Sequence, residues 1–332
     1  MPSSAGNKSV LYVATPLNTE FLQKITSGTL DREIVFVSDS PDTPVDDSEK
    51  CLAYWSSLNF PVTDGLLHRF PNLKFILTPT TGLTHISINP NEFKRIEVVS
   101  LQGEEVFLNS ITATAEHGWG LMLSLWRKSF LANNLTVYSP ELREDFASLQ
   151  LRNRTVGIIG FGRIGKLLAS YGKAFGMHII VFEKYKSYEQ SPEYSHVKFV
   201  SSVEEIAPVV DVLFLCASVI DADRNTYPIL GADFFRNTRE TLVLINTARG
   251  ILLDEVGAGQ ALRNAQIGGL GLDVLQVEDL PDLVDNTKFL FQLKDEGFNI
   301  AITPHIGGMC SDAFEMAFKH VWELFLRRIE NP

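Results

Sequence analysis

The chain has few cysteines, no long apolar run and no excess of basic charge, and each absence excludes a class of protein. No run of about 18 apolar residues exists, which argues against a membrane span. The net charge of −11 disfavours nucleic acid and anionic membranes as partners. The cysteines have no metal-ligand spacing and are expected to be reduced thiols; they are Cys51, Cys216 and Cys310.

The amino terminus and the overall composition set further limits. The first eight residues, MPSSAGNK, are polar and lack the apolar core of a signal peptide, so we predict a cytoplasmic protein. A length of 332 residues with 45% apolar content predicts about two domains with packed cores. Because the protein is acidic, a site for an acidic substrate needs a cation of its own.

Short apolar segments alternate with helical patterns through most of the chain, which predicts parallel α/β units. In the first part the predicted strands are 10–14, 34–37 and 73–77. In the second part they are 155–160, 179–183, 196–200, 211–216, 242–247, 269–273 and 299–303. The predicted helices between the later strands are 163–175, 202–208 and 254–264. This rhythm is typical of a doubly wound sheet.

Two further helices are expected to connect the parts of the fold. Residues 114–131 are apolar on nearly every side, which predicts a helix buried between domains, at a subunit interface, or at both. Residues 132–154 are polar and are predicted to be a linker region. The last helix, about 311–329, has an apolar stripe and is compatible with packing back on the first domain.

A glycine-rich loop predicts a dinucleotide-phosphate site. The apolar strand 155–159 runs into the loop and then into a helix beginning near Arg163. The first glycine permits a tight turn, the second lets the backbone approach the pyrophosphate, and the third lets helix and strand pack closely. The helix amino terminus adds N–H groups and partial positive charge. The candidate cofactor residues here are Gly160, Gly162, Arg163, Ile164 and Gly165.

Glu183 is the candidate ribose ligand. It ends the predicted strand 179–183 and lies 18 residues after Gly165, close to the spacing of about 20 that is typical of this carboxylate. A carboxylate there binds the adenosine ribose hydroxyls and repels a 2′-phosphate, which favours NAD over NADP. The alternative is that Glu183 is a solvated strand end.

Three charged or titratable residues follow later strands and suggest hydride-transfer chemistry. Arg249 follows the buried strand 242–245, and its forked guanidinium suits a substrate carboxylate. His305, after 300–304, is a candidate acid/base, and Glu278 is a candidate partner that orients its ring. The alternatives are a surface salt bridge for Arg249 and a capped strand-end histidine for His305. The remaining histidines, at 68, 85, 117, 178, 196 and 320, are interpreted as structural or surface residues.

This ordered set resembles the D-isomer-specific 2-hydroxyacid dehydrogenase family over roughly residues 70–315. The matching stretches are Leu73–Ile86, Ala115–His117, Thr155–Gly165, Asn246–Glu255, Gly271–Val274 and Thr303–Gly308. The resemblance implies two doubly wound parallel-sheet domains. One is a Rossmann NAD-binding domain at 114–305, and the other is a flavodoxin-like, discontinuous substrate domain at 1–113 and 306–332. It also implies a homodimer joined through helix 116–131.

The resemblance implies an NAD-dependent oxidoreductase that interconverts a 2-oxo acid and a D-2-hydroxy acid. Arg249 would bind the substrate carboxylate and carbonyl, and Glu278 with His305 would form the acid/base pair. Asp273 would contact the nicotinamide carboxamide, and Cys216 and Thr247 are further candidates for cofactor contact. The candidate substrate loop, which would hold the carboxylate through backbone N–H groups, contains Thr80, Thr81 and Gly82.

The chain departs from the family pattern at several points, which makes the substrate hard to name. Cys216-Ala217-Ser218 stands where His-Val-Pro is usual, the segment 219–225 is longer than usual, and Thr84-His85 stands where Asp-Asn or Asp-His is common. An alternative from another class is an NAD(H)-sensing binding protein, like the corepressors built on this fold. A formate or phosphite enzyme is disfavoured, because formate enzymes have glutamine in place of Glu278.

Overall fold

The computed structural model describes residues 10–28, 33–39, 47–56, 61–83, 85–185, 188, 191–219, 227–279 and 284–330. The polar amino terminus, Thr84 and most of the 219–225 segment lie outside these residues. Contacts divide the chain into two units, Met1–Ile111 with Cys310–Pro332, and Thr112–Met309. Residues 306–309, which the sequence assigned to the first domain, lie with the second because Ile306 and Gly307 donate to Asp273.

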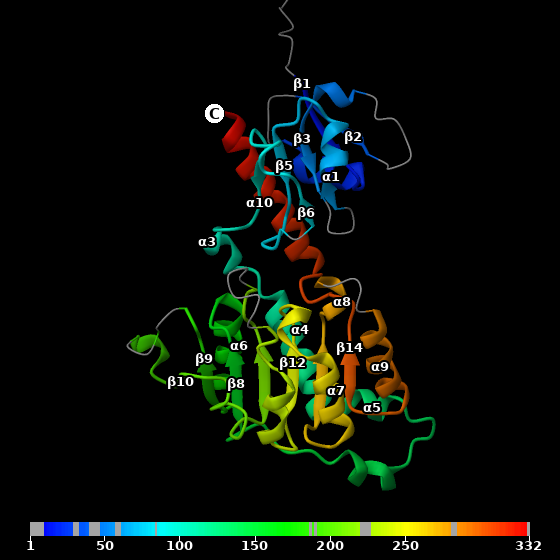
Figure 1. Ribbon diagram of the computed structural model, residues 1–332, viewed down its shortest axis with the longest axis vertical. Coiled ribbons are helices and arrows are strands. Elements are labelled where there is room, and N and C mark those ends of the chain that lie inside the picture. The colour runs from blue at the N-terminus through cyan, green and yellow to red at the C-terminus, as the bar shows by residue number, and fades with distance from the viewer. Residues whose placement is uncertain are drawn as a thin grey trace, which may run out of the picture. The chain divides into compact units, whose positions relative to one another are not determined.

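The first unit contains a five-stranded parallel sheet with the order β2-β1-β3-β5-β7 (Figure 1). This is the flavodoxin-like order, in agreement with the flavodoxin-like domain that the family resemblance implied. Its strands are β1 (Val10–Thr15), β2 (Glu33–Ser38), β3 (Cys51–Trp55), β5 (Phe75–Leu77) and β7 (Glu97–Val99), with a separate pair β4 (Val62–Thr63) and β6 (Ile86–Ser87). Its helices are α1 (Thr19–Thr26), η1 (Ser48–Lys50), α2 (Asp64–His68), α3 (Glu105–Leu108) and α10 (Ser311–Glu330).

Side chains on the two faces of this sheet pack into separate cores, as strand alternation requires. Val13 and Trp55 face the cluster that includes α1 and α10, whereas Ala14 and Tyr54 face the cluster that includes α2. Trp55 stacks on Trp322 of α10 with ring centroids 5.5 Å apart and an interplanar angle of 7°. The carboxyl-terminal helix is therefore part of the core of the first unit.

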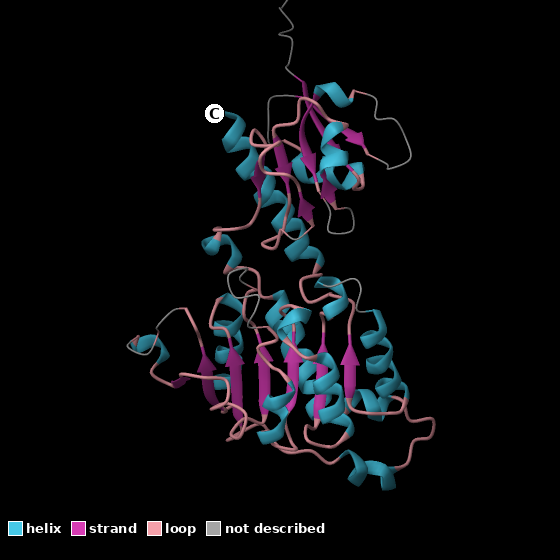
Figure 2. Ribbon diagram, viewed as in Figure 1, coloured by secondary structure: helices cyan, strands magenta, loops and turns pink. Residues whose placement is uncertain are grey.

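The second unit contains a seven-stranded parallel sheet in the Rossmann order, β10-β9-β8-β11-β12-β13-β14, and its arrows point the same way in Figure 2. The strands are β8 (Thr155–Ile159), β9 (His178–Phe182), β10 (Val197–Val200), β11 (Val212–Leu215), β12 (Val243–Asn246), β13 (Gly269–Leu272) and β14 (Ile300–Ile302). All seven were predicted from their apolar runs, and the predicted fold class is confirmed.

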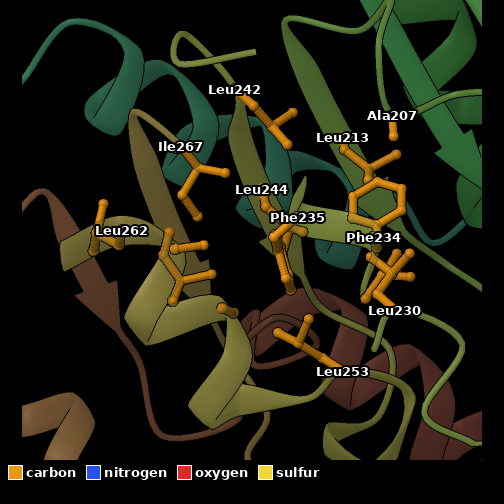
Figure 3. Packing of buried hydrophobic residues seen from close by; sticks show 14 of the residues in the cluster. Ala207, Leu213, Leu230, Phe234, Phe235, Leu242, Leu244, Leu253, Leu262 and Ile267 are labelled. Carbon is orange, nitrogen blue, oxygen red and sulfur yellow. The ribbon is translucent and has the colours of Figure 1, made fainter. Parts of the chain in front are cut away.

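Helices cover both faces of this second sheet. They are α4 (Ala113–Trp126), α5 (Ser129–Asn133), η2 (Pro140–Phe146), α6 (Arg163–Ala174), η3 (Pro192–Tyr194), η5 (Ala232–Asn237), η6 (Gly250–Leu252), α7 (Glu255–Arg263), α8 (Gln276–Asp279) and α9 (Val284–Asp295). Leu213 and Leu244 pack with Phe235 and Leu262 in the cluster that includes α7 and α9, as Figure 3 shows. The opposite cluster includes α4 and α6. None of the described helices is long and apolar enough to cross a membrane.

Several element predictions were wrong in detail. Residues 202–208 form turns rather than a helix, because Pro208 leaves too short a segment to continue one. The predicted helix 114–131 is two helices, since the chain turns at Lys128, where φ is 53°. Strands β3 and β7 and helix α9 were missed. β7 has only three residues, and the identity of both segments as strands depends on pairing with distant residues.

We expect truncation of Phe318 to destabilise the first unit. The Phe318 side chain is 2% exposed and its ring stacks on Trp55 at 5.5 Å, so Phe318→Ala leaves a cavity. The expected cost is about 3–5 kcal/mol, read as a lower urea midpoint of the transition that reports the first unit. The matched control is Met316→Ala on the same helix, whose side chain is 40% exposed. Equal midpoints for the two variants would contradict this packing.

Candidate active site

The candidate site residues of the second unit follow the carboxyl ends of its parallel strands. The loop of Gly160 follows β8, Glu183 follows β9, Cys216 follows β11, Arg249 follows β12, and Asp273 follows β13. His305 comes three residues after β14. Because parallel strands end at one edge of the sheet, the topology gathers residues from distant positions at that edge, where open α/β sheets bind their ligands.

The structure brings His305 and Glu278 into direct contact. Nδ1 of His305 lies 2.6 Å from Oε2 of Glu278, and the other carboxylate oxygen accepts the N–H of Leu275 at 2.9 Å. The two side chains are 45% and 39% exposed, so the ring is reachable from solvent. Among the described residues, Nε2 of His305 has no hydrogen-bond partner. The imidazole is therefore held at one nitrogen and available at the other.

Electrostatics favour the charged forms of both partners. The hydrogen bond that His305 donates to Glu278 raises the pKa of His305 above its ordinary value, against partial burial and the positive charge of Arg249. Burial opposes ionisation of Glu278, but hydrogen bonds from His305 and from the Leu275 N–H outweigh it, so the pKa of Glu278 is lowered. Arg249 acts on both groups, which places its charge near the pair. Both shifts favour the imidazolium–carboxylate form of the pair.

Asp273 holds the backbone around His305. Its carbonyl oxygen accepts the N–H of His305 at 2.8 Å, and its carboxylate accepts the N–H groups of Ile306 at 2.9 Å and Gly307 at 2.8 Å. His305 has φ 54°, a left-handed conformation that needs such support. The carboxylate is 2% exposed and engaged at both oxygens. These contacts favour a positioning role for Asp273, and the contact with nicotinamide implied by the family resemblance stays a prediction.

His117 of α4 belongs to the same network, although the sequence interpretation left it as structural or surface. Its Nε2 lies 3.1 Å from Oγ1 of Thr303 and 3.2 Å from Oδ1 of Asp273, while the Thr303 hydroxyl donates to Asp273 at 2.6 Å. His117 and Thr303 are 186 positions apart in the chain. A single sequence holds no signal for this contact beyond a histidine on an apolar helix.

Arg249 is placed by its neighbours in the turn after β12. Asn246 is fully buried; its amide donates to the carbonyl of Arg249 at 2.9 Å and its oxygen accepts the Ala248 N–H at 3.0 Å. A Cβ on Gly250 would lie 2.1 Å from the carbonyl carbon of Leu275, so only glycine allows this close approach. The turn that carries Arg249 thereby touches the segment that leads into Glu278.

The phosphate loop has the shape that a dinucleotide needs. Gly160 has φ 93°, and a Cβ there would lie 2.6 Å from the backbone of Ala217. A Cβ on Gly165 would lie 2.2 Å from the Gly160 carbonyl oxygen. Gly162, in contrast, is exposed and a Cβ there would meet nothing within 4 Å, so its surroundings are open to a ligand. Helix α6 begins after Gly162 without a side-chain cap, which leaves its first N–H groups for an anion.

The other candidate cofactor residues surround this loop. Oε2 of Glu183 accepts the Phe161 N–H at 2.7 Å and Oε1 accepts the Tyr185 N–H at 3.0 Å, so the carboxylate also braces the loop. The N–H of Cys216 donates to Ile159 at 2.8 Å, and burial raises the pKa of its thiol to about 12. Arg163, Ile164 and Thr247 are half-buried. These residues fit a dinucleotide between the loop and the strand ends.

The candidate substrate loop lies in the first unit, after β5. Each of its carbonyl oxygens is bonded: Thr80 accepts from the Leu101 N–H at 3.0 Å and Thr81 from the Gln102 side-chain amide at 3.0 Å. Gly82 accepts from the Thr80 hydroxyl at 2.8 Å. Among the described residues, no acceptor binds the N–H groups of residues 80–83. The loop therefore presents unpaired donors, the arrangement that suits an anion.

The described residues contain no group of three or more His, Cys, Asp or Glu side chains that could hold a metal ion.

Comparison with known proteins identifies the class of this chain. Residues 119–307, more than half of the chain, match the model described as "D-isomer specific 2-hydroxyacid dehydrogenase, NAD binding domain". The chain belongs to the D-isomer specific 2-hydroxyacid dehydrogenase family, and its cofactor is NAD. The resemblance inferred from the sequence is confirmed.

Individual relatives differ in size and in the reaction that their names state. The glyoxylate reductase of Thermococcus litoralis is 30% identical over 260 residues, 75% of this chain and 72% of that protein. The D-3-phosphoglycerate dehydrogenase of Bacillus subtilis is 30% identical over 76% of this chain, which spans only 44% of that relative. The apo-structure of D-lactate dehydrogenase from Escherichia coli superposes with a TM-score of 0.76 at 22% identity, covering 97% of each chain. At that identity the likeness establishes the fold.

We expect Glu278→Gln to lower the pKa of His305 towards its ordinary value of about 6.5. The native pKa is raised, so the extra stability of the protonated ring is present below pH 6.5 or so and is lost as the pH rises through the raised value. The variant removes the charge behind this shift. The measurement is an NMR titration of the His305 ring, with Glu104→Gln, which alters the remote pair with His320, as the control. An unchanged His305 titration would contradict the coupling.

We expect Gly162→Ala to weaken NADH binding without unfolding the protein. The backbone at Gly162 has φ −75° and space around it, so the methyl group blocks only the approach of the pyrophosphate. The expected loss is about tenfold or more in Kd, roughly 1.4 kcal/mol, measured by NADH fluorescence titration. Gly165→Ala is the contrasting variant, because its methyl group collides with Gly160 and should lower Tm. Native affinity in Gly162→Ala would refute this placement of the pyrophosphate.

Proposed function

We propose that this chain is an NAD-dependent oxidoreductase that interconverts a 2-oxo acid and a D-2-hydroxy acid. The observation that carries the proposal is the contact between His305 and Glu278 beside the charge of Arg249, at the strand ends of an NAD-binding domain. Bound NAD supplies the hydride acceptor, and NADH the donor. The proposed tasks of the protein are to hold the acid, to orient its carbonyl and to move one proton.

His305 is the proposed proton donor in the reducing direction. With Nδ1 bound to Glu278, the imidazolium releases the proton at Nε2 to the carbonyl oxygen as the hydride reaches the carbonyl carbon. The neutral ring then takes a proton from solvent, to which it is exposed. In the oxidising direction the neutral ring accepts the hydroxyl proton. Glu278 supports both directions because it orients the ring and stabilises its charge.

Arg249 and the loop at Thr80, Thr81 and Gly82 are the proposed groups for the substrate carboxylate. One N–H of Arg249 donates to the Ala248 carbonyl at 2.7 Å, and the remaining donors of the fork suit a carboxylate and the neighbouring carbonyl oxygen. The family resemblance also assigns the carboxylate to the backbone N–H groups of the loop, which belongs to the first unit. A local cation and backbone donors offset the net charge of −11, which repels an acid at long range.

A cytoplasmic homodimer, joined through residues 116–131, stays part of the proposal. The apolar character of α4 is largely explained inside the chain, since Trp119, Met122 and Leu125 are buried within the second unit. Beyond α4, Phe130 is 42% exposed. The dimer surface is therefore expected to extend into the segment that follows the helix.

We expect His305→Ala to lower kcat by about 10² to 10⁴, and Arg249→Ala to abolish turnover, with NADH binding retained in both. The measurement is NADH consumption with glyoxylate, pyruvate, hydroxypyruvate and longer 2-oxo acids, because the family fixes the cofactor and the panel samples the side chain. The control is His178→Ala, at the exposed start of β9, the end of that strand opposite to the candidate residue Glu183.

Two outcomes would overturn the proposed function. One is the absence of turnover across the whole panel by a protein that binds NADH. The other is near-native kcat in His305→Ala. NADH-dependent capture of a partner that survives His305→Ala would instead support the binding-protein alternative.

A further inference from the structure

A buried chain of hydroxyl groups runs from His85 to the substrate loop in the first unit. His85 is 8% exposed, and its Nε2 lies 3.0 Å from Oγ1 of Thr78 and 3.3 Å from Oγ of Ser56. Thr78 Oγ1 lies 2.9 Å from Oγ1 of Thr80, which donates to the Gly82 carbonyl. The sequence interpretation gave His85 no function, and the proposed acid/base chemistry does not use it.

The number of protons fixes the direction of each hydrogen bond in this series from His85 to Gly82, because each hydroxyl has only one proton to donate. The Thr80 hydroxyl donates its proton to the Gly82 carbonyl, so its oxygen accepts the hydrogen bond from Thr78. Thr78 thereby spends its own proton and accepts from His85. Ser56 donates to the Leu77 carbonyl at 3.1 Å, so it also accepts from His85. Both neighbours of Nε2 are acceptors, and Nε2 must carry the proton.

The other ring nitrogen supports the same assignment. Nδ1 of His85 is buried and has no hydrogen-bond partner among the residues that the structure describes. A proton there would be an unsatisfied buried donor on a charged ring, which is costly, whereas a bare lone pair costs less. Burial also lowers the pKa of His85 below its ordinary value. The ring is therefore neutral, with its proton on Nε2.

The last hydrogen bond of this series, from the Thr80 hydroxyl to the Gly82 carbonyl, helps to determine how the loop presents its amides. In a trans peptide the C=O of one residue and the N–H of the next point in opposite directions. Bonds that tie back the carbonyls of Thr80, Thr81 and Gly82 therefore turn the N–H groups of residues 81, 82 and 83 the other way. The third of these ties is the Thr80 hydroxyl, whose orientation depends on Thr78 and His85.

We propose that His85 is a positioning residue for substrate binding: its Nε2–H sets a one-way relay through Thr78 and Thr80 that holds the loop amides ready for the carboxylate. This inference rests on the proposed function, because that function assigns the carboxylate to the loop. His85 does not touch the substrate. Its effect is on the affinity for the acid, through the fixed orientation of the Gly82 peptide.

Paired variants test the relay by kinetics. His85→Leu removes the donor, and His85→Gln places an amide nitrogen near the position of Nε2; Thr78→Val breaks the relay with little change of shape, and Thr78→Ser keeps it. We expect KM for the best 2-oxo acid to rise about tenfold in the Leu and Val variants, with kcat within about twofold and NADH affinity unchanged, because ground-state and transition-state binding are lost equally. The Gln and Ser variants should stay near the native KM.

Thr26→Val is the matched control, since it removes another buried hydroxyl of the first unit that donates to a backbone carbonyl of its own helix. Its KM should equal that of the unchanged protein. Native KM in both His85→Leu and Thr78→Val would overturn the proposal. So would an equal rise in the Gln and Ser variants, since that would indicate loss of packing rather than loss of the relay.

An NMR measurement tests the relay without any turnover. In ¹⁵N-histidine-labelled protein, the signal that disappears in His85→Gln should have a protonated Nε2 and a bare Nδ1. It should still have this form at a pH just below the ordinary histidine pKa of about 6.5. A proton on Nδ1, or a charged ring at that pH, would refute the relay. Because this result needs no substrate, absence of turnover by the unchanged protein would count against the proposed function alone.

Discussion

The geometry of the candidate active site depends on Asp273. Its carbonyl and its buried carboxylate together accept three successive N–H groups, those of residues 305, 306 and 307. These bonds support the left-handed backbone at His305 and so determine where its ring reaches Glu278. The hydroxyl of Thr303 and the ring of His117 bind the same carboxylate. The proposed acid/base pair, which is partly exposed, is thus held in place by a buried carboxylate.

The two candidate binding loops are built by opposite means. Next to His305, the Asp273 carboxylate accepts backbone N–H groups, and the His305 side chain is the group available to a ligand. In the loop at 80–82, N–H and O–H groups donate to the backbone carbonyl oxygens, and the backbone N–H groups are the ones available to a ligand. Both arrangements tie up one half of the peptide so that the rest is available. Pre-organisation of this kind means that little reorganisation is needed when a charged ligand binds.

Much of the fold was predictable because its signals are local. The seven strands of the second sheet are apolar runs, and Gly165 is required by a close contact with the carbonyl oxygen of Gly160 in the same loop. Elements with weaker local signals were missed. β7 has only three residues, both β3 and β7 pair with a strand elsewhere in the chain, and the break at Lys128 is a single left-handed residue inside an apolar pattern. Tertiary pairing decided these elements.

The sequence by itself determined the glycine-rich loop, the strands of the second sheet and the candidate residues that follow those strands. Each of these is encoded by adjacent residues or by a strand and the loop after it. Only the tertiary structure decided which distant residues the histidines contact. His117 meets Thr303 across 186 positions, and His85 meets Ser56 across 29. Such contacts arise from helices and strands packing together, and a hydrogen bond between distant residues leaves no local pattern in the chain.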